Sequence, residues 1–255
     1  MRDLMTCALN GADMFDLDDR IYIEDITEKV NIDHEAVGRA AYGMLPQNTP
    51  RHKSIVITVK FMVKERIRFE RNGVVHKIQS WAKQGWLTTN IHPNQRIYVF
   101  CTGLPSINTF KWTERMEVQF TAYGEAYWQD ITPLEYSSET DTTSASMIIK
   151  PICSHDCFFE AQITPSGGTL TSVSVTVGSQ SFQLSGLSIS ANAVLSIYYD
   201  ELHLLHIESG GVSLLNKRTG ASSDDLILVA NQNNTVAMTF NVACAYTINI
   251  RRLWE

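Results

Sequence analysis

The chain has 255 residues, of which 44% are hydrophobic, so it is long enough to form two ordinary domains with genuine cores. Its formal net charge of −6 disfavours a dedicated nucleic-acid binder. The cysteines are an odd and sparse set for a chain of this size, which argues against a disulfide framework. We therefore expect them to be reduced and mostly buried; they are Cys7, Cys101, Cys153, Cys157 and Cys244.

The first 20 residues carry several aspartates and no apolar run after a basic start, so we expect no secretory signal. No stretch approaches the length that is needed to cross a bilayer. These features predict a soluble protein that is made in a cytoplasm.

A Ser/Thr-rich segment, residues 136–146, separates two regions of different charge. Residues 1–135 hold 16 Lys/Arg and 17 Asp/Glu, whereas residues 136–255 hold 5 and 10. The segment has no large aliphatic residue that could face a core. It predicts a linker or exposed loop between an N-terminal domain, residues 1–135, and a C-terminal domain, residues 147–255.

The N-terminal region predicts a β domain with one helix. Apolar residues alternate over 55–63, which indicates a long strand with one buried face. Residues 97–101 and 116–122 predict two further strands. Between them, residues at three- and four-residue spacing predict a helix over about 66–84 that ends at Gly85; they are Ile67, Arg71, Val74, Ile78 and Trp81.

The C-terminal region predicts nine short strands separated by Gly, Ser and Asn turns, and it requires no helix. This pattern is typical of an antiparallel β-sandwich. The predicted strands lie within residues 159–163, 173–177, 182–184, 187–189, 194–199, 202–207, 226–230, 236–242 and 246–250.

The string from Cys153 to Cys157 is the most metal-like feature of the sequence. On an extended strand Cys153, His155 and Cys157 would project from one face, as soft zinc ligands should. Structural zinc needs a fourth ligand, and His203 and His206 would face opposite ways on a strand. We therefore interpret the pair as buried thiols near a strand end, and we predict no metal site.

Other candidate chemistry is equally incomplete. Asp16, Asp18 and Asp19 lack the glycine and the distal glutamate of a calcium loop, so a solvated acidic turn is the better interpretation. The sequence contains no nucleophile elbow, phosphate-binding glycine loop or zinc-protease motif. We predict a non-enzymatic protein with no catalytic residues and no cofactor.

One basic region could form a positive face on the predicted strand and helix, although Glu65 and Glu70 interrupt it. Without interleaved exposed aromatic residues, such a cluster is more often a solvated face or a subunit contact than a nucleic-acid platform. Its members are Arg51, His52, Lys53, Lys60, Lys64, Arg66, Arg68, Arg71, Lys77 and Lys83.

Taken in order, the motifs resemble a known family over nearly the whole chain. In the first half, Asn10-Gly11 comes before an alternating strand at 21–26, and Gly43 comes before the long strand and the helix that bears Trp81. Next come a Pro-x-x-Arg-x-Tyr string at 93–98 and a Val-x-Phe string at 118–120. In the second half, an apolar strand at 195–200 ends in Asp, and residues 228–234 lead through a turn to Asn234. Together these motifs resemble the distal tail protein (Dit) family of siphophages and prophages; the departure is at 230–232, where Pro-Gly is usual.

The resemblance implies a structural virion protein of a long-tailed phage or prophage. It implies a homo-hexameric ring in which the N-terminal domains form the hub and galectin-like C-terminal sandwiches lie outside. The ring would join the tail tube protein to tail-tip, baseplate and receptor-binding proteins, and it would be assembled in the cytoplasm of the bacterial host. It implies no membrane partner and no sequence-specific nucleic acid.

A carbohydrate-binding β-sandwich module is the alternative. Tyr198, Tyr199, Trp254 and several asparagines in the C-terminal region could contact sugars.

Overall fold

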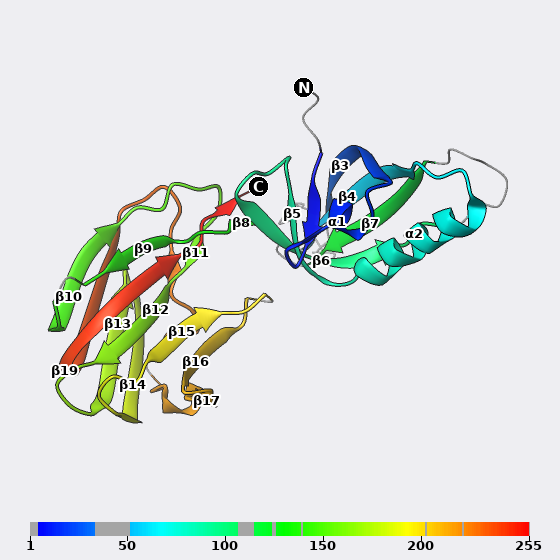
Figure 1. Cartoon of the computed structure of the whole chain (residues 1–255). Helices are drawn as coiled ribbons and strands as arrows, with labels where there is room; N and C mark the ends of the chain where they lie inside the picture. The colour runs from blue at the N-terminus through cyan, green and yellow to red at the C-terminus, as the bar shows by residue number, and fades with distance from the viewer. Residues whose placement is uncertain are drawn as a thin grey trace, which may run out of the picture. The chain divides into compact units, whose positions relative to one another are not determined.

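A computed structural model describes residues 5–33, 52–106, 115–123, 126–138, 140–201, 203–220 and 222–254. The chain divides into two compact units between Trp128 and Gln129. Both units consist mainly of antiparallel strands, which confirms the predicted mainly β fold class (Figure 1). No helix in these ranges has the length and apolar character that a membrane span requires.

The first unit is built on an antiparallel sheet with the strand order β2-β1-β5-β6-β7-β4-β3. The strands are β1 Cys7–Leu9, β2 Ala12–Asp13, β3 Ile21–Asp33, β4 His52–Val63, β5 Gly85–Thr89, β6 Gln95–Gly103 and β7 Met116–Ala122. A further strand, β8 Trp128–Asp130, begins where the two units divide. The strands expected over 55–63, 97–101 and 116–122 are all present.

The described residues of this unit include two helices, the four-residue α1 (Met14–Leu17) and the predicted helix α2 (Arg68–Trp81). The apolar stripe is the reason that α2 forms here: Val74 and Ile78 are buried, and Trp81 makes an edge contact with Phe120 of β7 at 5.9 Å. Phe120 pairs with Ile57 of β4, so α2 covers the face of the sheet that carries the alternating apolar residues of β4 (Figure 1).

A tight Asn-Gly turn joins β1 and β2. Asn10 and Gly11 both have positive φ, 52° and 80°, as a two-residue hairpin loop requires. The Asn10 side-chain oxygen then accepts a hydrogen bond from the backbone N–H of Trp86 at 2.9 Å. Gly85 permits this approach, because a Cβ at that position would lie 2.2 Å from the same oxygen. Gly85 therefore opens β5, whereas α2 ends earlier, at Trp81, instead of at Gly85 as expected.

The second unit contains a nine-stranded antiparallel sheet. Its strands are β9 Leu134–Ser137, β10 Thr142–Ile149, β12 Glu160–Pro165, β13 Leu170–Val177, β14 Gln180–Ile189, β15 Leu195–Tyr199, β16 Leu205–Ser209, β17 Val212–Ser213 and β19 Asn234–Ile250. The short strands β11 (Cys157–Phe158) and β18 (Ile227–Leu228) pair with each other, and the remaining elements are the 3-10 turn η1 (Leu215–Lys217) and β20 (Leu253–Trp254).

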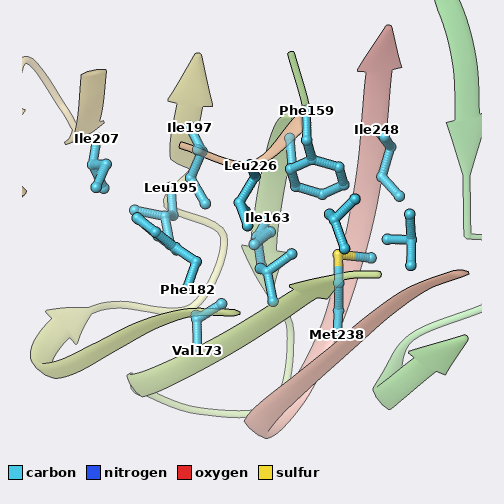
Figure 2. Packing of buried hydrophobic residues seen from close by; sticks show 14 of the residues in the cluster. Phe159, Ile163, Val173, Phe182, Leu195, Ile197, Ile207, Leu226, Met238 and Ile248 are labelled. Carbon is cyan, nitrogen blue, oxygen red and sulfur yellow. The ribbon is translucent and has the colours of Figure 1, made fainter. Parts of the chain in front are cut away.

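The long strand β19 makes the sheet into a sandwich, because it contributes to both layers. Its first part, through Phe240, pairs with β13 and with most of β10, and its last part, from Cys244, pairs with β12, with β9 and, at Thr142, with the start of β10. Side chains of the two layers meet in one apolar core, where Phe159 and Ile163 face Val173, Phe182 and Met238 (Figure 2). The predicted C-terminal antiparallel β-sandwich is confirmed.

The expected linker at 136–146 is wrong. Residues in this segment belong to β9 and β10, which both pair with β19, so the segment is part of the sandwich. The division between units lies at Trp128/Gln129, before the expected end of the first domain at residue 135. Composition misled the prediction because Ser and Thr can occupy the solvent side of an outer strand while their backbones complete the ladder.

Two pairs of predicted strands are single strands. Residues 182–184 and 187–189 both lie in β14, where Gly186, at φ +66°, adjoins a register shift against β13. Residues 236–242 and 246–250 both lie in β19, which continues from one layer to the other. In β14 a turn-type residue, Gly186, therefore accompanies a register shift where the sequence predicted a chain reversal, and β19 continues through residues 243–245 without one.

Candidate functional site

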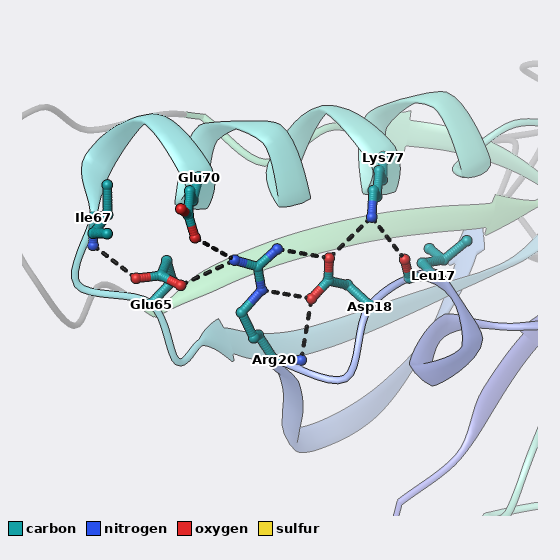
Figure 3. Close-up of polar contacts among 7 residues, drawn as sticks. All are labelled: Leu17, Asp18, Arg20, Glu65, Ile67, Glu70 and Lys77. Carbon is teal, nitrogen blue, oxygen red and sulfur yellow. Dashed lines mark hydrogen bonds and ion pairs between the residues drawn. The ribbon is translucent and has the colours of Figure 1, made fainter.

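A network of charged side chains fastens α2 to the turn between α1 and β3. Asp18 accepts hydrogen bonds from Arg20 Nε at 2.7 Å, from Arg20 Nη2 at 3.0 Å and from Lys77 Nζ at 3.0 Å (Figure 3). Arg20 also donates to Glu65 at 2.9 Å and to Glu70 at 3.0 Å. Residues from three segments therefore meet at one arginine.

The electrostatics of this network favour the ionised carboxylates of Asp18 and Glu65. The hydrogen bonds from Arg20 hold the pKa of Asp18 well below its usual range, with Lys77 adding to the effect. The pKa of Glu65 is also lowered, first by the backbone N–H of Ile67 and then by Arg20. The side chain of Asp18 is only 6% exposed, so the expected solvated acidic turn is wrong at this position.

Among the side chains that the structure describes, several members of the predicted basic region are paired or buried and so do not contribute to a free positive face. Lys77 is paired with Asp18, Lys60 lies 3.4 Å from Asp25, and Arg71 is buried. Arg66 and Arg68 are exposed. Arg51 and the side chains of His52 and Lys53 lie outside the described residues.

The start of α2 presents two large apolar side chains to solvent. Phe69 is 86% exposed and Ile67 is 58% exposed. Phe69 lies two positions from Arg71, off the buried stripe, so its exposure could have been predicted from helical spacing. Exposed apolar side chains of this size are candidates for contact with another protein.

The strand β3 offers a second feature for contacts between proteins. It has 13 residues and ends the strand order of the first sheet, so one side of its backbone has no neighbouring strand among the described residues. Such an edge can pair with a strand of another chain. Two of its acidic side chains have partners: Glu24 forms an ion pair with Arg115 at 2.9 Å, and Glu28 is hydrogen-bonded to the ring of His92 at 2.8 Å.

The predicted string from Cys153 to Cys157 folds as a loop that brings its two thiols together. The sulfur atoms are 3.3 Å apart, and both approach the backbone carbonyl of His155, at 3.2 Å for Cys153 and 3.5 Å for Cys157. Burial raises the pKa of Cys157, and contact with the second thiol adds to this shift. Within the described ranges no group of three or more His, Cys, Asp or Glu side chains could hold a metal ion.

The three aromatic residues proposed for sugar contact are not brought together. Tyr199 is buried, stacks on Phe158 at 4.3 Å and accepts a hydrogen bond from the backbone N–H of Leu226. Trp254 donates its indole N–H to Asp130 at 2.8 Å. Tyr198 is half-buried on the other face of β15.

Tyr198 instead belongs to a small polar and aromatic cluster. Its ring stacks on His206 of β16, with centroids 5.1 Å apart and planes inclined by 12°. Its hydroxyl donates to Glu208 at 3.1 Å, and His206 contacts Asp200 at 3.1 Å. Register explains the pairing, because Tyr198 lies directly opposite His206 in the ladder.

No protein-family model matches the sequence, and no curated relative matches it. Solved structures do match. The Dit hub protein of phage SPP1, described as a paradigm of the hub adsorption apparatus in phages that infect Gram-positive hosts, aligns with a TM-score of 0.64 and 10% identity over 98% of this chain and 99% of that one.

Two chains from baseplate structures are also similar. One, from the phage P2 baseplate in its activated conformation with Ca, has a TM-score of 0.50 and 11% identity over 91% of this chain and 90% of that one. The other, from the p2 baseplate with Sr, has a TM-score of 0.52 and 11% identity over 97% of each chain. The resemblance that the sequence predicted is therefore confirmed at the level of the fold: this chain has the fold of phage tail hub and baseplate proteins.

Proposed function

We propose that the chain is a structural, non-enzymatic virion protein that serves as a hub at the tip of a phage tail. The observation that carries this proposal is the match to the SPP1 Dit protein, which spans both units and nearly the full length of both chains. A shared sandwich alone would be weak support, since such folds host many functions. A shared order of two dissimilar units is far more specific.

In this proposal the first unit forms a closed ring, a homo-hexamer as the family resemblance implies. The open edge of β3 and the exposed Phe69 and Ile67 support self-association of this unit. In a closed cyclic ring every subunit contacts its neighbours in the same way, so no strand edge of this kind is left unpaired. The ring would join the tail tube protein to tail-tip or tail-associated and receptor-binding proteins, within a virion assembled in the host cytoplasm.

Light scattering and negative-stain electron microscopy of the purified chain test this proposal. We expect a ring-shaped oligomer whose mass is a small multiple of 28.7 kDa. Phe69→Asp should weaken it, whereas Ile148→Asp, which changes a 67% exposed apolar residue of the second unit, should not. A wild-type protein that stays strictly monomeric at high concentration would refute the proposal. If Ile148→Asp weakened the oligomer and Phe69→Asp did not, the ring contact would lie in the second unit instead of the first.

Carbohydrate binding by the second unit is a second candidate, and the Tyr198–His206 stack favours it. A flat aromatic pair flanked by the carboxylates of Asp200 and Glu208 offers a stacking surface and hydrogen-bond acceptors for a sugar. A glycan array with the wild type and with Tyr198→Ala tests it. Specific binding that the substitution abolishes would support this candidate, and no binding by the wild type would remove it.

A further inference from the structure

The loop that carries Cys153 and Cys157 contains two thiols in direct contact inside the second unit. Both side chains are buried, and their sulfur atoms lie 3.3 Å apart. A disulfide needs its sulfurs at about 2.0 Å, so a small rotation of the two side chains would bring them to bonding distance. The other cysteines, Cys7, Cys101 and Cys244, have no thiol neighbour in the described part of the chain.

The backbone around the pair is held on two sides, so the thiols are kept close together in the folded protein. The backbone N–H groups of Ser154 and His155 both donate to the carbonyl of Leu253 in β20, at 3.1 and 3.2 Å. On the other side Cys157 pairs with Leu228 of β18, and the Asn231 side chain donates to the carbonyl of Cys153 at 2.8 Å.

We infer that Cys153 and Cys157 are a modification site, at which a disulfide-class oxidant such as oxidised glutathione converts the two thiols into one intramolecular disulfide. The geometry favours this reaction over metal binding. Only two thiols converge, the third contact is the carbonyl of His155, and a structural zinc ion needs four ligands. The inference is independent of the proposed hub function.

The reaction proceeds in two exchange steps. One thiol loses its proton, and its sulfur attacks oxidised glutathione, forming a mixed disulfide and releasing one reduced glutathione. The second thiol then loses its proton and attacks the mixed disulfide, forming the Cys153–Cys157 bond and releasing a second reduced glutathione. Two protons and two electrons leave the protein, and the oxidant gains both.

Burial makes this reaction slow. The thiolate is the reacting form, and the raised pKa of Cys157 keeps its population low at neutral pH. The oxidant also needs transient opening of the loop, so we expect conversion over hours. The product should be long-lived, because the same burial hinders attack by external thiols.

Thiol counting by mass spectrometry tests the inference on the full chain. After incubation with oxidised glutathione, unfolding and alkylation, the five alkylated cysteines of the reduced protein should fall to three, with Cys153 and Cys157 protected. Peptide mapping should find the bond between these two residues. Cys244→Ser is the matched control and should still lose two reactive thiols, whereas Cys153→Ser should form no intramolecular disulfide.

If Cys153→Ser does not fold, the melting temperature of the wild-type protein before and after oxidation provides a second test. The short closed loop should raise the melting temperature of the oxidised protein by about 5 °C, and a phosphine reductant should reverse the rise. Five free thiols after prolonged oxidation, a bond between other cysteines, or crosslinked dimers would each overturn the inference.

Discussion

Neutralising Asp18 should loosen the attachment of α2 and leave the fold intact. Asp18→Asn preserves the shape of the side chain but removes its charge and places an amide N–H where donors from Arg20 or Lys77 now point. The side chains of Arg20 and Lys77 are 31% and 55% exposed, whereas that of Asp18 is 6% exposed. The Arg20 contacts should therefore carry most of the effect.

The stability lost in Asp18→Asn should lie between the values for breaking a buried ion pair and an exposed one. Breaking a fully buried ion pair costs about 3–5 kcal/mol, and an exposed pair contributes about 0–1 kcal/mol. For Asp18, a buried acceptor with half-exposed donors, we expect a loss of about 2 kcal/mol in the free energy of unfolding of the first unit. Lys77→Met should cost about 0.5 kcal/mol, because its charge is largely solvated.

The pH dependence supplies a second, independent signature. Because the folded state lowers the pKa of Asp18, its contribution is fully present above the unfolded pKa of about 3.9 and is lost as the pH falls further, through the folded pKa. The difference in stability between the wild type and Asp18→Asn should therefore be constant near neutral pH and shrink below about pH 4.

Hydrogen exchange of the α2 amides, combined with urea unfolding, measures these effects within the first unit. Asp19→Asn is the matched control, because Asp19 is the next residue in the chain and is exposed. Equal protection of α2 in the two variants, or a difference from wild type that persists unchanged at low pH, would refute the role assigned to Asp18.

Gly85→Ala should destabilise the first unit by about 2–3 kcal/mol, since its Cβ would collide with the Asn10 amide. Gly73→Ala should instead stabilise this unit by up to about 1 kcal/mol, because Gly73 lies on the exposed face of α2 with open space around it. Urea unfolding measures both changes. Asn234→Ala should cost about 3 kcal/mol by the same assay, because that buried amide bonds four backbone groups. A fragment of residues 129–255 should give a cooperative unfolding transition, whereas 147–255, which lacks β9 and most of β10, should not; circular dichroism distinguishes them.

The elements that were predictable from the sequence are those whose side-chain pattern reports burial directly. The stripe that contains Val74 and Ile78 indicated α2 because a helix turns the same face to the sheet every three or four residues. Alternation over 55–63 indicated β4 for the corresponding reason in a strand. Each pattern arises because one face of a single element is buried, so it can be recognised without knowing which residues cover that face.

The features that were missed depend on partners that are distant in the chain. The Ser/Thr segment is ordered by backbone pairing with β19, which leaves no trace in its own composition. Asp18 resembles its neighbours Asp16 and Asp19 in sequence, and its contacts with Arg20 and with Lys77, 59 residues later, distinguish it only in the folded chain. The thiol contact was foreseen as two buried cysteines, but its distance was not, because the extended strand assumed for 153–157 is a loop.

The low sequence identity to the phage proteins limits which residues can support a functional argument. At 10–11% identity few side chains are shared, yet the fold persists, because cores tolerate replacement when pattern and volume are kept. Contact surfaces tolerate replacement differently, since binding depends on a few well-placed side chains. The ring contact that we propose for this chain must therefore be found on its own surface, and the comparison of Phe69→Asp with Ile148→Asp tests it without assuming any residue of a relative.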